Sequence, residues 1–108
     1  MKKILLSAAV VMVCGSLAAG GFAETRTGRS GEELFKEHCS ACHPEGGNII
    51  STSKTLRKAD REAHGIMNQT DIVEKMRHPG KGMTSWSAST LPDADALEIA
   101  DYILKTFK

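Results

Sequence analysis

The chain has 108 residues, of which 14 are lysine or arginine and 13 are aspartate or glutamate, so its formal net charge is +1. A chain this close to neutral lacks the basic excess of a typical nucleic-acid-binding protein, and we expect no nucleic acid partner. Its length suits one small domain, whose core would be only marginally stable if protein atoms alone formed it.

The N-terminus has the layout of a secretory signal peptide. Lys2 and Lys3 precede a stretch, Ile4 to Ala23, that carries no charged residue and ends in small residues. Cleavage before Glu24 would leave residues 24–108 as the mature domain. Loss of the two lysines leaves 12 basic against 13 acidic residues, a net charge of −1 before any cofactor. We therefore expect an exported protein in the periplasm.

Two alternatives concern the same segment. Cys14 stands where a bacterial lipoprotein signal has its lipidated cysteine, although Val13 occupies a position at which a small residue is expected. Lipidation there would anchor the protein in the outer membrane. The apolar stretch is also just long enough for an uncleaved anchor, but its glycines weaken that interpretation. We expect no membrane span in the mature form.

The first predicted helix begins at a capping-box pattern, Ser30 followed by Glu33. Residues 24–29 before it are polar. The helix is expected to carry two apolar residues and two cysteines: Leu34, Phe35, Cys39 and Cys42. Helix-breaking residues follow at once: Pro44, Gly46, Gly47 and Asn48.

The segment from Cys39 to His43 reads Cys-Ser-Ala-Cys-His, the attachment motif of c-type haem. Haem has two vinyl groups on one edge, and each forms a thioether with one cysteine. Two cysteines three residues apart in a helical turn place both sulfurs on one side. The imidazole of His43 then reaches the iron, while a backbone carbonyl or water holds its other nitrogen. We predict one covalent haem c held by Cys39, Cys42 and His43.

Two other kinds of site use closely spaced cysteines. One is a thioredoxin-like redox pair, and the other is a zinc site that His38, His64 or His78 would complete. A redox pair normally lies in a βαβ unit, and a zinc site normally has a second closely spaced pair of ligands. The sequence contains neither pattern, so haem is the preferred interpretation.

Two short helices are predicted after a loop. The first spans about residues 55–64 and ends at Gly65. The second is capped by Asn68 or Thr70 and stops before Pro79. Its apolar face holds Ile72, Val73 and Met76.

The last predicted helix has Pro92 in its first turn and apolar residues at helical spacing: Leu97, Ala100, Ile103, Leu104 and Phe107. No run of alternating β-branched residues predicts a strand. The fold class is therefore all-α, with about four helices around one haem. Because the haem supplies much of the core, we expect the haem-free chain to be poorly folded.

A second axial ligand must come from elsewhere in the chain. The candidates are Met67, Met76, Met83, His38, His64 and His78. Met83 is preferred because it follows a loop rich in glycine, where the backbone can approach a porphyrin. Met76 is in phase with Ile72 and Val73 and is expected in the core. His64 and His78 are the alternatives, and an open site is the third.

These features resemble a class I monohaem cytochrome c, specifically the short photosynthetic electron-shuttle type and its bacterial periplasmic relatives. The similarity covers nearly the whole mature chain and is carried by Gly31, Leu34, Phe35, Cys39–His43, Gly46–Asn48, Lys54–Leu56, Gly82, Met83 and Tyr102. It implies the cytochrome c fold, a crossing of the first and last helices near Gly31, Phe35 and Tyr102, and Met83 as sixth ligand. The family commonly has proline and phenylalanine where this chain has Thr84 and Trp86.

An iron held by His43 and Met83 has no open position, which suits a carrier of single electrons cycling between Fe(II) and Fe(III), and not an enzyme. A haem-based small-ligand sensor or a peroxidase-like protein with a labile sixth ligand is the alternative function. Redox partner proteins would dock near the haem edge, and we expect a monomer. Two basic clusters are candidates for docking, with a solvated face as the alternative for each: Lys54, Arg57, Lys58 and Arg61, and Arg77, His78 and Lys81.

Overall fold

The computed structural model describes residues 28–108, so the predicted signal peptide, 1–23, and Cys14 lie outside the described residues. Within this range the chain forms helices, turns and loops without a strand, which confirms the predicted all-α class. The elements are α1 (Gly31–His38), the short 3-10 helix η1 (Pro44–Gly46), α2 (Lys58–Ala63), α3 (Gln69–Arg77) and α4 (Asp93–Thr106). No helix in residues 28–108 has the length and apolar character that crossing a membrane requires.

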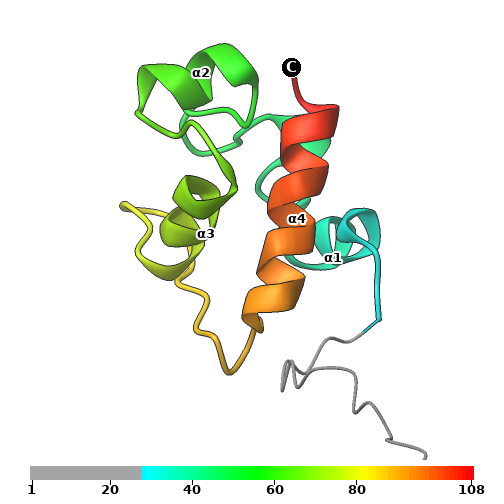
Figure 1. The fold of residues 1–108 in the computed structure, drawn as a ribbon. Coiled ribbons are helices and arrows are strands. Elements are labelled where there is room, and N and C mark those ends of the chain that lie inside the picture. Colours follow the sequence, from blue (N-terminus) through cyan, green and yellow to red (C-terminus); the bar gives the residue numbers. More distant parts are fainter. Residues whose placement is uncertain (1–27) are drawn as a thin grey trace, which may run out of the picture.

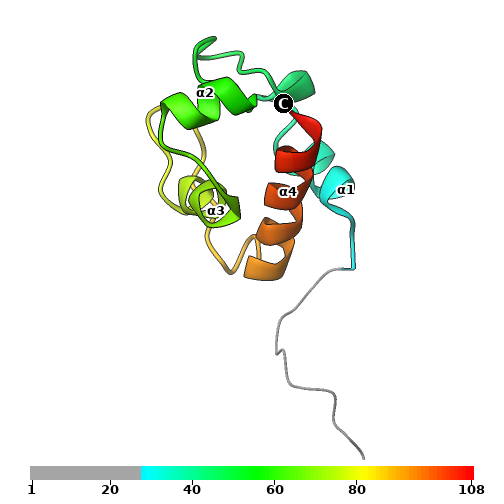
Figure 2. The same ribbon diagram turned by 45° about the horizontal axis from the view of Figure 1, so that its top comes forward.

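The longest helix, α4, is the centre of the fold. Both α1 and α3 pack against it, and in two views α1 lies on one side of α4 while α2 and α3 lie on the other (Figures 1 and 2). The core consists of ten buried apolar side chains: Leu34, Phe35, Ile72, Met76, Leu91, Ala96, Ile99, Ala100, Ile103 and Phe107.

Helix α1 begins where the sequence predicts it. The Ser30 hydroxyl accepts a hydrogen bond from the Glu33 N–H at 3.2 Å. The helix ends at His38, however, so the prediction that it carries Cys39 and Cys42 is wrong. Ser40 explains the early end, because its hydroxyl donates to the Lys36 carbonyl, the acceptor that its own N–H would use in a continuing helix.

The next two helices match the prediction in position but not always in length. Helix α2 covers 58–63 and not 55–64, because the Thr55 hydroxyl binds the Asp60 carboxylate and accepts from the Arg57 N–H, which holds residues 55–57 in a turn. Asn68 caps α3, and its capping box with Asp71 decides between the two predicted caps.

The buried face of α4 differs from the predicted one at its N-terminal end. Leu97, expected in the core, is 42% exposed, whereas Ala96 and Ile99 are fully buried. The reason is that α4 contacts α1 and α3 on two sides, so its buried face is broader and is rotated from the one that Leu97 indicated. Ala100, Ile103 and Phe107 are buried as predicted, and Leu104 is partly buried.

The crossing of α1 and α4 lies where the family resemblance implies it. Gly31 of α1 is buried against α4, and the Phe35 ring lies 5.4 Å from the Tyr102 ring between centroids. The Phe107 ring completes an aromatic cluster, at 5.3 Å from Phe35 and 5.8 Å from Tyr102. This cluster fixes the helix that leads into the cysteine motif.

Candidate haem site

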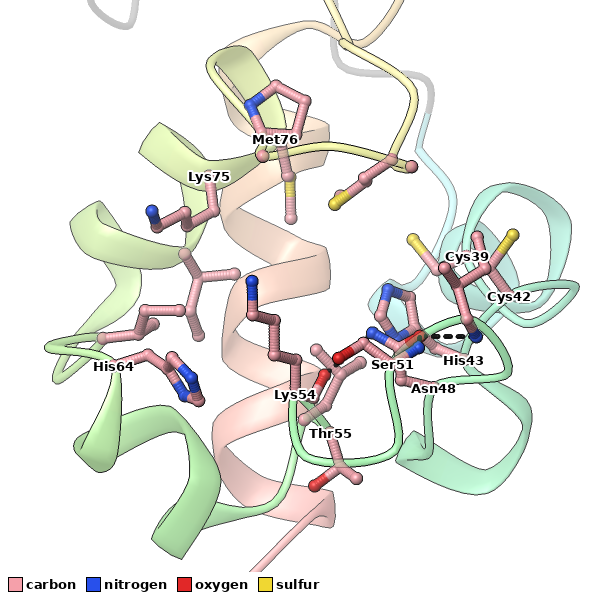
Figure 3. A pocket seen from close by; sticks show the side chains of 18 of the residues that line it. Cys39, Cys42, His43, Asn48, Ser51, Lys54, Thr55, His64, Lys75 and Met76 are labelled. Atoms are coloured by element: carbon pink, nitrogen blue, oxygen red, sulfur yellow. Dashed lines mark hydrogen bonds between the residues drawn. The ribbon is translucent and has the colours of Figure 1, made fainter.

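A cavity of about 260 Å³ opens beside the cysteine motif. Its walls come from the motif, the loops at residues 48–56 and 79–86, and helices α2, α3 and α4. In Figure 3, Cys39, Cys42 and His43 lie on one side of the cavity, with His64 and Lys75 across from them. The four residues predicted to hold haem all line this one cavity: Cys39, Cys42, His43 and Met83.

The imidazole of His43 is oriented by the backbone of Gly47. Its Nδ1 lies 2.7 Å from the Gly47 carbonyl oxygen. Because a carbonyl oxygen only accepts hydrogen bonds, Nδ1 is the donor, and in the neutral form of the ring this tautomer has its lone pair on Nε2. The sequence predicts a carbonyl or water in this role, and the structure identifies the carbonyl. A neutral imidazole held in this way is ready to bind a metal through Nε2.

The two cysteines of the motif are free thiols in different surroundings. Cys39 is the C-cap of α1 and packs against the core, whereas Cys42 is exposed. Burial raises the pKa of the Cys39 thiol to about 11, so its sulfur is uncharged at neutral pH. A thioether sulfur is uncharged as well, so covalent attachment would keep Cys39 in the state that this environment favours.

The cavity separates the six candidates for a second axial ligand into two groups. Met76, Met83 and His64 line it, while Met67, His38 and His78 are not among its lining residues. Met76 is only 4% exposed and belongs to the core, as its helical phase predicts. Met83 is 38% exposed, so core packing does not hold its side chain in place.

His64 is the third candidate that lines the cavity. Its Nδ1 lies 2.8 Å from the Asp60 carbonyl oxygen, so its Nε2 also has a free lone pair. It follows the end of α2, where the sequence places a helix-terminal histidine. His64 therefore remains an alternative to Met83 as the second axial ligand.

Apolar side chains from several elements form the cavity walls. They are Leu56, Ile66, Ile72, Trp86, Leu91 and Ile103. Trp86, at the position where the family commonly has phenylalanine, lines the cavity. Its ring also contacts the His38 ring at 5.0 Å between centroids. An apolar cavity of this size exceeds the voids normally found in protein interiors, which indicates a bulky apolar group.

Two arginines that the sequence placed in exposed basic clusters are instead held inside the fold. Arg61 is 4% exposed, and its guanidinium donates to the carbonyl oxygens of Leu56 at 2.7 Å and Phe107 at 3.1 Å. The Arg77 side chain is 14% exposed and also donates to backbone carbonyls. These arginines therefore serve the fold and leave the docking clusters smaller than predicted.

Lysines divide into two classes according to their distance from the cavity. Lys54, Lys75 and Lys81 line it, and no described carboxylate lies within ion-pair distance of them. Three lysines elsewhere on the described surface pair with acids on their own helices: Lys36 with Glu32 at 3.1 Å, Lys58 with Glu62 at 3.3 Å, and Lys105 with Asp101 at 2.6 Å. The three lysines that line the cavity differ from these in having no ion pair with a described carboxylate.

The arrangement fits haem better than the two alternatives considered from the sequence. Two free thiols match the vinyl groups of haem, an imidazole and a thioether match its iron, and the apolar walls match its macrocycle. In residues 28–108, no group of three or more His, Cys, Asp or Glu side chains is placed to hold a metal ion, so a zinc site finds no support there. The described residues also lack the strands of a thioredoxin-like unit.

Comparison with known proteins gives a consistent result. The family model described as cytochrome c oxidase, cbb3-type, subunit III matches residues 26–103. Cytochrome c6 of Cyanidium caldarium is 30% identical over 96% of this chain and 94% of its own length. Cytochrome c6 of Bumilleriopsis filiformis is 36% identical over 69% of this chain and 86% of its own length.

Solved structures show the same similarity. Outer membrane cytochrome F of Geobacter sulfurreducens is 44% identical, with a TM-score of 0.72 over 73% of this chain and 100% of its own. Cytochrome c6 of the diatom Phaeodactylum tricornutum is 28% identical, with a TM-score of 0.63 over 69% of this chain and 87% of its own.

These similarities extend over most of the chain and include the fold as well as the sequence. The cofactor is therefore one covalently attached c-type haem, and the protein is an electron carrier and not an enzyme. The chain belongs to the class I monohaem c-type cytochromes.

Proposed function

We propose that the protein is an exported carrier of single electrons in which Cys39 and Cys42 bind the haem and His43 and Met83 are its axial ligands. The observation that carries the proposal is that Met83, far along the chain from the motif, lines the same cavity as the other three residues. The haem supplies one-electron chemistry through the change in oxidation state of its iron. The protein orients the group and shields it from water.

Each proposed ligand has a distinct role. The Gly47 carbonyl holds the His43 imidazole in one orientation, with Nε2 as the nitrogen available for a ligand bond. A methionine thioether as the second ligand raises the reduction potential, whereas a second histidine would lower it. With both positions filled by side chains, small molecules would have no free coordination position, which favours electron transfer over ligand activation.

The surface beside the cavity supports docking of an acidic redox partner. Lys54, Lys75 and Lys81 offer positive charge that no described carboxylate neutralises. Ile49 and Ile50 are exposed, and Ile50 lies against the Met83 loop, since a Cβ on Gly82 would be 3.3 Å from Ile50 Cγ2. An apolar patch rimmed by cations suits a transient complex that is steered by charge and completed by apolar contact.

The proposed location is the periplasm after removal of residues 1–23. The alternative is a lipid anchor on Cys14 in the outer membrane, a location that the name of the Geobacter relative mentions for that protein. Mass spectrometry of the exported protein distinguishes the two. A chain that begins at Glu24 with one haem supports cleavage, whereas a lipid-modified chain that begins at Cys14 supports the anchor.

The ligand proposal is tested by the weak long-wavelength absorption band that reports sulfur ligation in oxidised haem proteins. We expect the band in the wild type and its loss in Met83→Ala. Met67→Ala is the matched control, because Met67 is exposed and does not line the cavity. A band that persists in Met83→Ala and disappears in Met76→Leu would transfer the role to Met76.

The alternative function rests on His64, whose Nε2 is free beside the cavity. Carbon monoxide added to the reduced protein distinguishes sensor or peroxidase-like chemistry from electron transfer. We expect no shift of the main haem band in the wild type. A shift would show that the sixth position is open or labile and would favour the alternative function.

A further inference from the structure

The loop that carries Met83 is attached to α3 almost entirely on one side of the methionine. The loop runs from Pro79 to Leu91 between α3 and α4. The Trp86 N–H donates to the Met76 carbonyl at 2.8 Å, and the Ser85 hydroxyl donates to the Arg77 carbonyl at 2.8 Å. These bonds join two loop residues that follow Met83 to the last two residues of α3.

The Arg77 side chain strengthens the same attachment. One guanidinium nitrogen, Nη1, donates to the carbonyl oxygens of Trp86 at 3.0 Å and Leu91 at 2.8 Å. The other, Nη2, lies 2.6 Å from a carboxylate oxygen of Asp93 at the start of α4. A single side chain thus connects the end of α3, two points of the loop and the beginning of α4.

The surroundings distinguish the strong contacts from the weak one. The Leu91 side chain is fully buried, and the Arg77 side chain is largely shielded, so the carbonyl bonds are protected from competing water. The Asp93 side chain is 67% exposed, and an ion pair that open to solvent contributes little. A planar guanidinium with several donors makes all three contacts at once, which a lysine ammonium could not reproduce with the same geometry.

We propose that Arg77 is a positioning residue for the sixth ligand. The Arg77 latch consists of the bonds that Arg77 Nη1 donates to the Trp86 and Leu91 carbonyls and the bonds that Trp86 N–H and the Ser85 hydroxyl donate to the Met76 and Arg77 carbonyls. It holds the loop against α3 and thereby holds the Met83 thioether at the cavity. Core packing does not perform this task, because Met83 is partly exposed. The proposal deepens the proposed function and rests on it, since it explains how a ligand on an irregular loop keeps its place.

The latch is tested in the haem-loaded protein by amide hydrogen exchange and by the sulfur-ligation band. In Arg77→Met we expect exchange of the Trp86 amide to accelerate about tenfold or more relative to the Ile99 amide in the core of α4, because the shielded hydrogen bonds to the Trp86 and Leu91 carbonyls are lost. The sulfur-ligation band should weaken, and the reduction potential should fall. Arg77→Lys should restore only part of the band.

Three further variants separate the latch from other effects. Asp93→Asn removes only the exposed ion pair, and Arg57→Met removes an exposed arginine, so both should leave the Trp86 exchange and the band near wild type. Ser85→Ala removes one exposed contact and should accelerate Trp86 exchange more mildly. If Arg77→Met does not fold, Ser85→Ala decides the question in the same assay.

Two results would overturn different statements. If Trp86 exchange relative to Ile99 is unchanged in Arg77→Met, the latch is refuted. If Arg77→Met does not fold, the same result in Ser85→Ala refutes it. A wild type without the sulfur-ligation band would refute Met83 ligation, and the exchange data would still establish whether Arg77 holds the loop.

Discussion

Gly31 and Tyr102 meet where α1 crosses α4, at a distance that leaves no room for a side chain. A Cβ on Gly31 would lie 2.9 Å from the Tyr102 Cβ and would overlap the Glu98 carbonyl oxygen. Two helices can approach this closely only where one of them has no side chain. The contact fixes α1, and with it the start of the haem-attachment segment.

The first prediction concerns this contact. Gly31→Ala should destabilise the protein by about 2 kcal/mol or more, because the new methyl group forces the two backbones apart. Alanine would otherwise favour a helix by about 1 kcal/mol over glycine. Thermal unfolding of the variant and the wild type measures the loss, and equal stability would contradict the close crossing.

The second prediction concerns the cavity without its cofactor. Without haem, the apolar walls of this cavity face water and lose the burial that the cofactor provides. A domain of this size has little other core to compensate for that loss. A variant with Cys39→Ala and Cys42→Ala should therefore lack covalent haem and unfold without a cooperative transition, as followed by circular dichroism. A sharp transition in the haem-free chain would show that the protein core suffices.

The third prediction separates the two classes of lysine. Reversing the charge at Lys54, Lys75 or Lys81 should slow oxidation by the anionic reagent ferricyanide several-fold and accelerate oxidation by a cationic cobalt complex, with both effects reduced by salt. The same reversal at the paired lysines Lys36 or Lys105 should change both rates less. Stopped-flow absorbance provides the rates. Equal effects of the two classes would remove the charge argument for docking.

The fourth prediction compares two arginines that lie four residues apart. Arg61→Met leaves the carbonyl oxygens of Leu56 and Phe107 without their donor, which should cost about 2–4 kcal/mol. Arg57→Met should cost less than about 0.5 kcal/mol, because Arg57 is exposed. Chemical denaturation of the haem-loaded proteins measures both. Similar losses would mean that the Arg61 bonds contribute little.

The sequence predicts those features that depend on local patterns. Cap residues and helix periodicity located all four helices, and Ser30 and Asn68 are the caps that the structure shows. The haem motif and the glycine-rich loop predict four site residues, and the fold brings these four candidates to one cavity. These signals are local because each arises from a few neighbouring residues whose chemistry is specific.

Features that depend on tertiary contacts were missed. The sequence places Arg61 and Arg77 in exposed basic clusters. Nothing in the neighbouring residues shows that their guanidinium groups will donate hydrogen bonds to backbone carbonyls inside the fold. Leu97 was placed in the core, because one helix alone does not reveal that two partners will pack against α4. The sequence also does not indicate that the apolar side chains of Ile49 and Ile50 are exposed, because exposure depends on how the surrounding loops pack.

Phe107 joins parts of the fold that lie far apart in the sequence. This ring packs against Phe35 and Tyr102, the backbone of Gly46 leaves it room, and its carbonyl binds Arg61. Because Phe107 is the penultimate residue of the sequence, removal of only residues 107 and 108 would take away its contacts with Phe35 and Tyr102 and one acceptor of Arg61. The attachment of α1 to α4 and the burial of Arg61 thus both depend on the last turn of the chain.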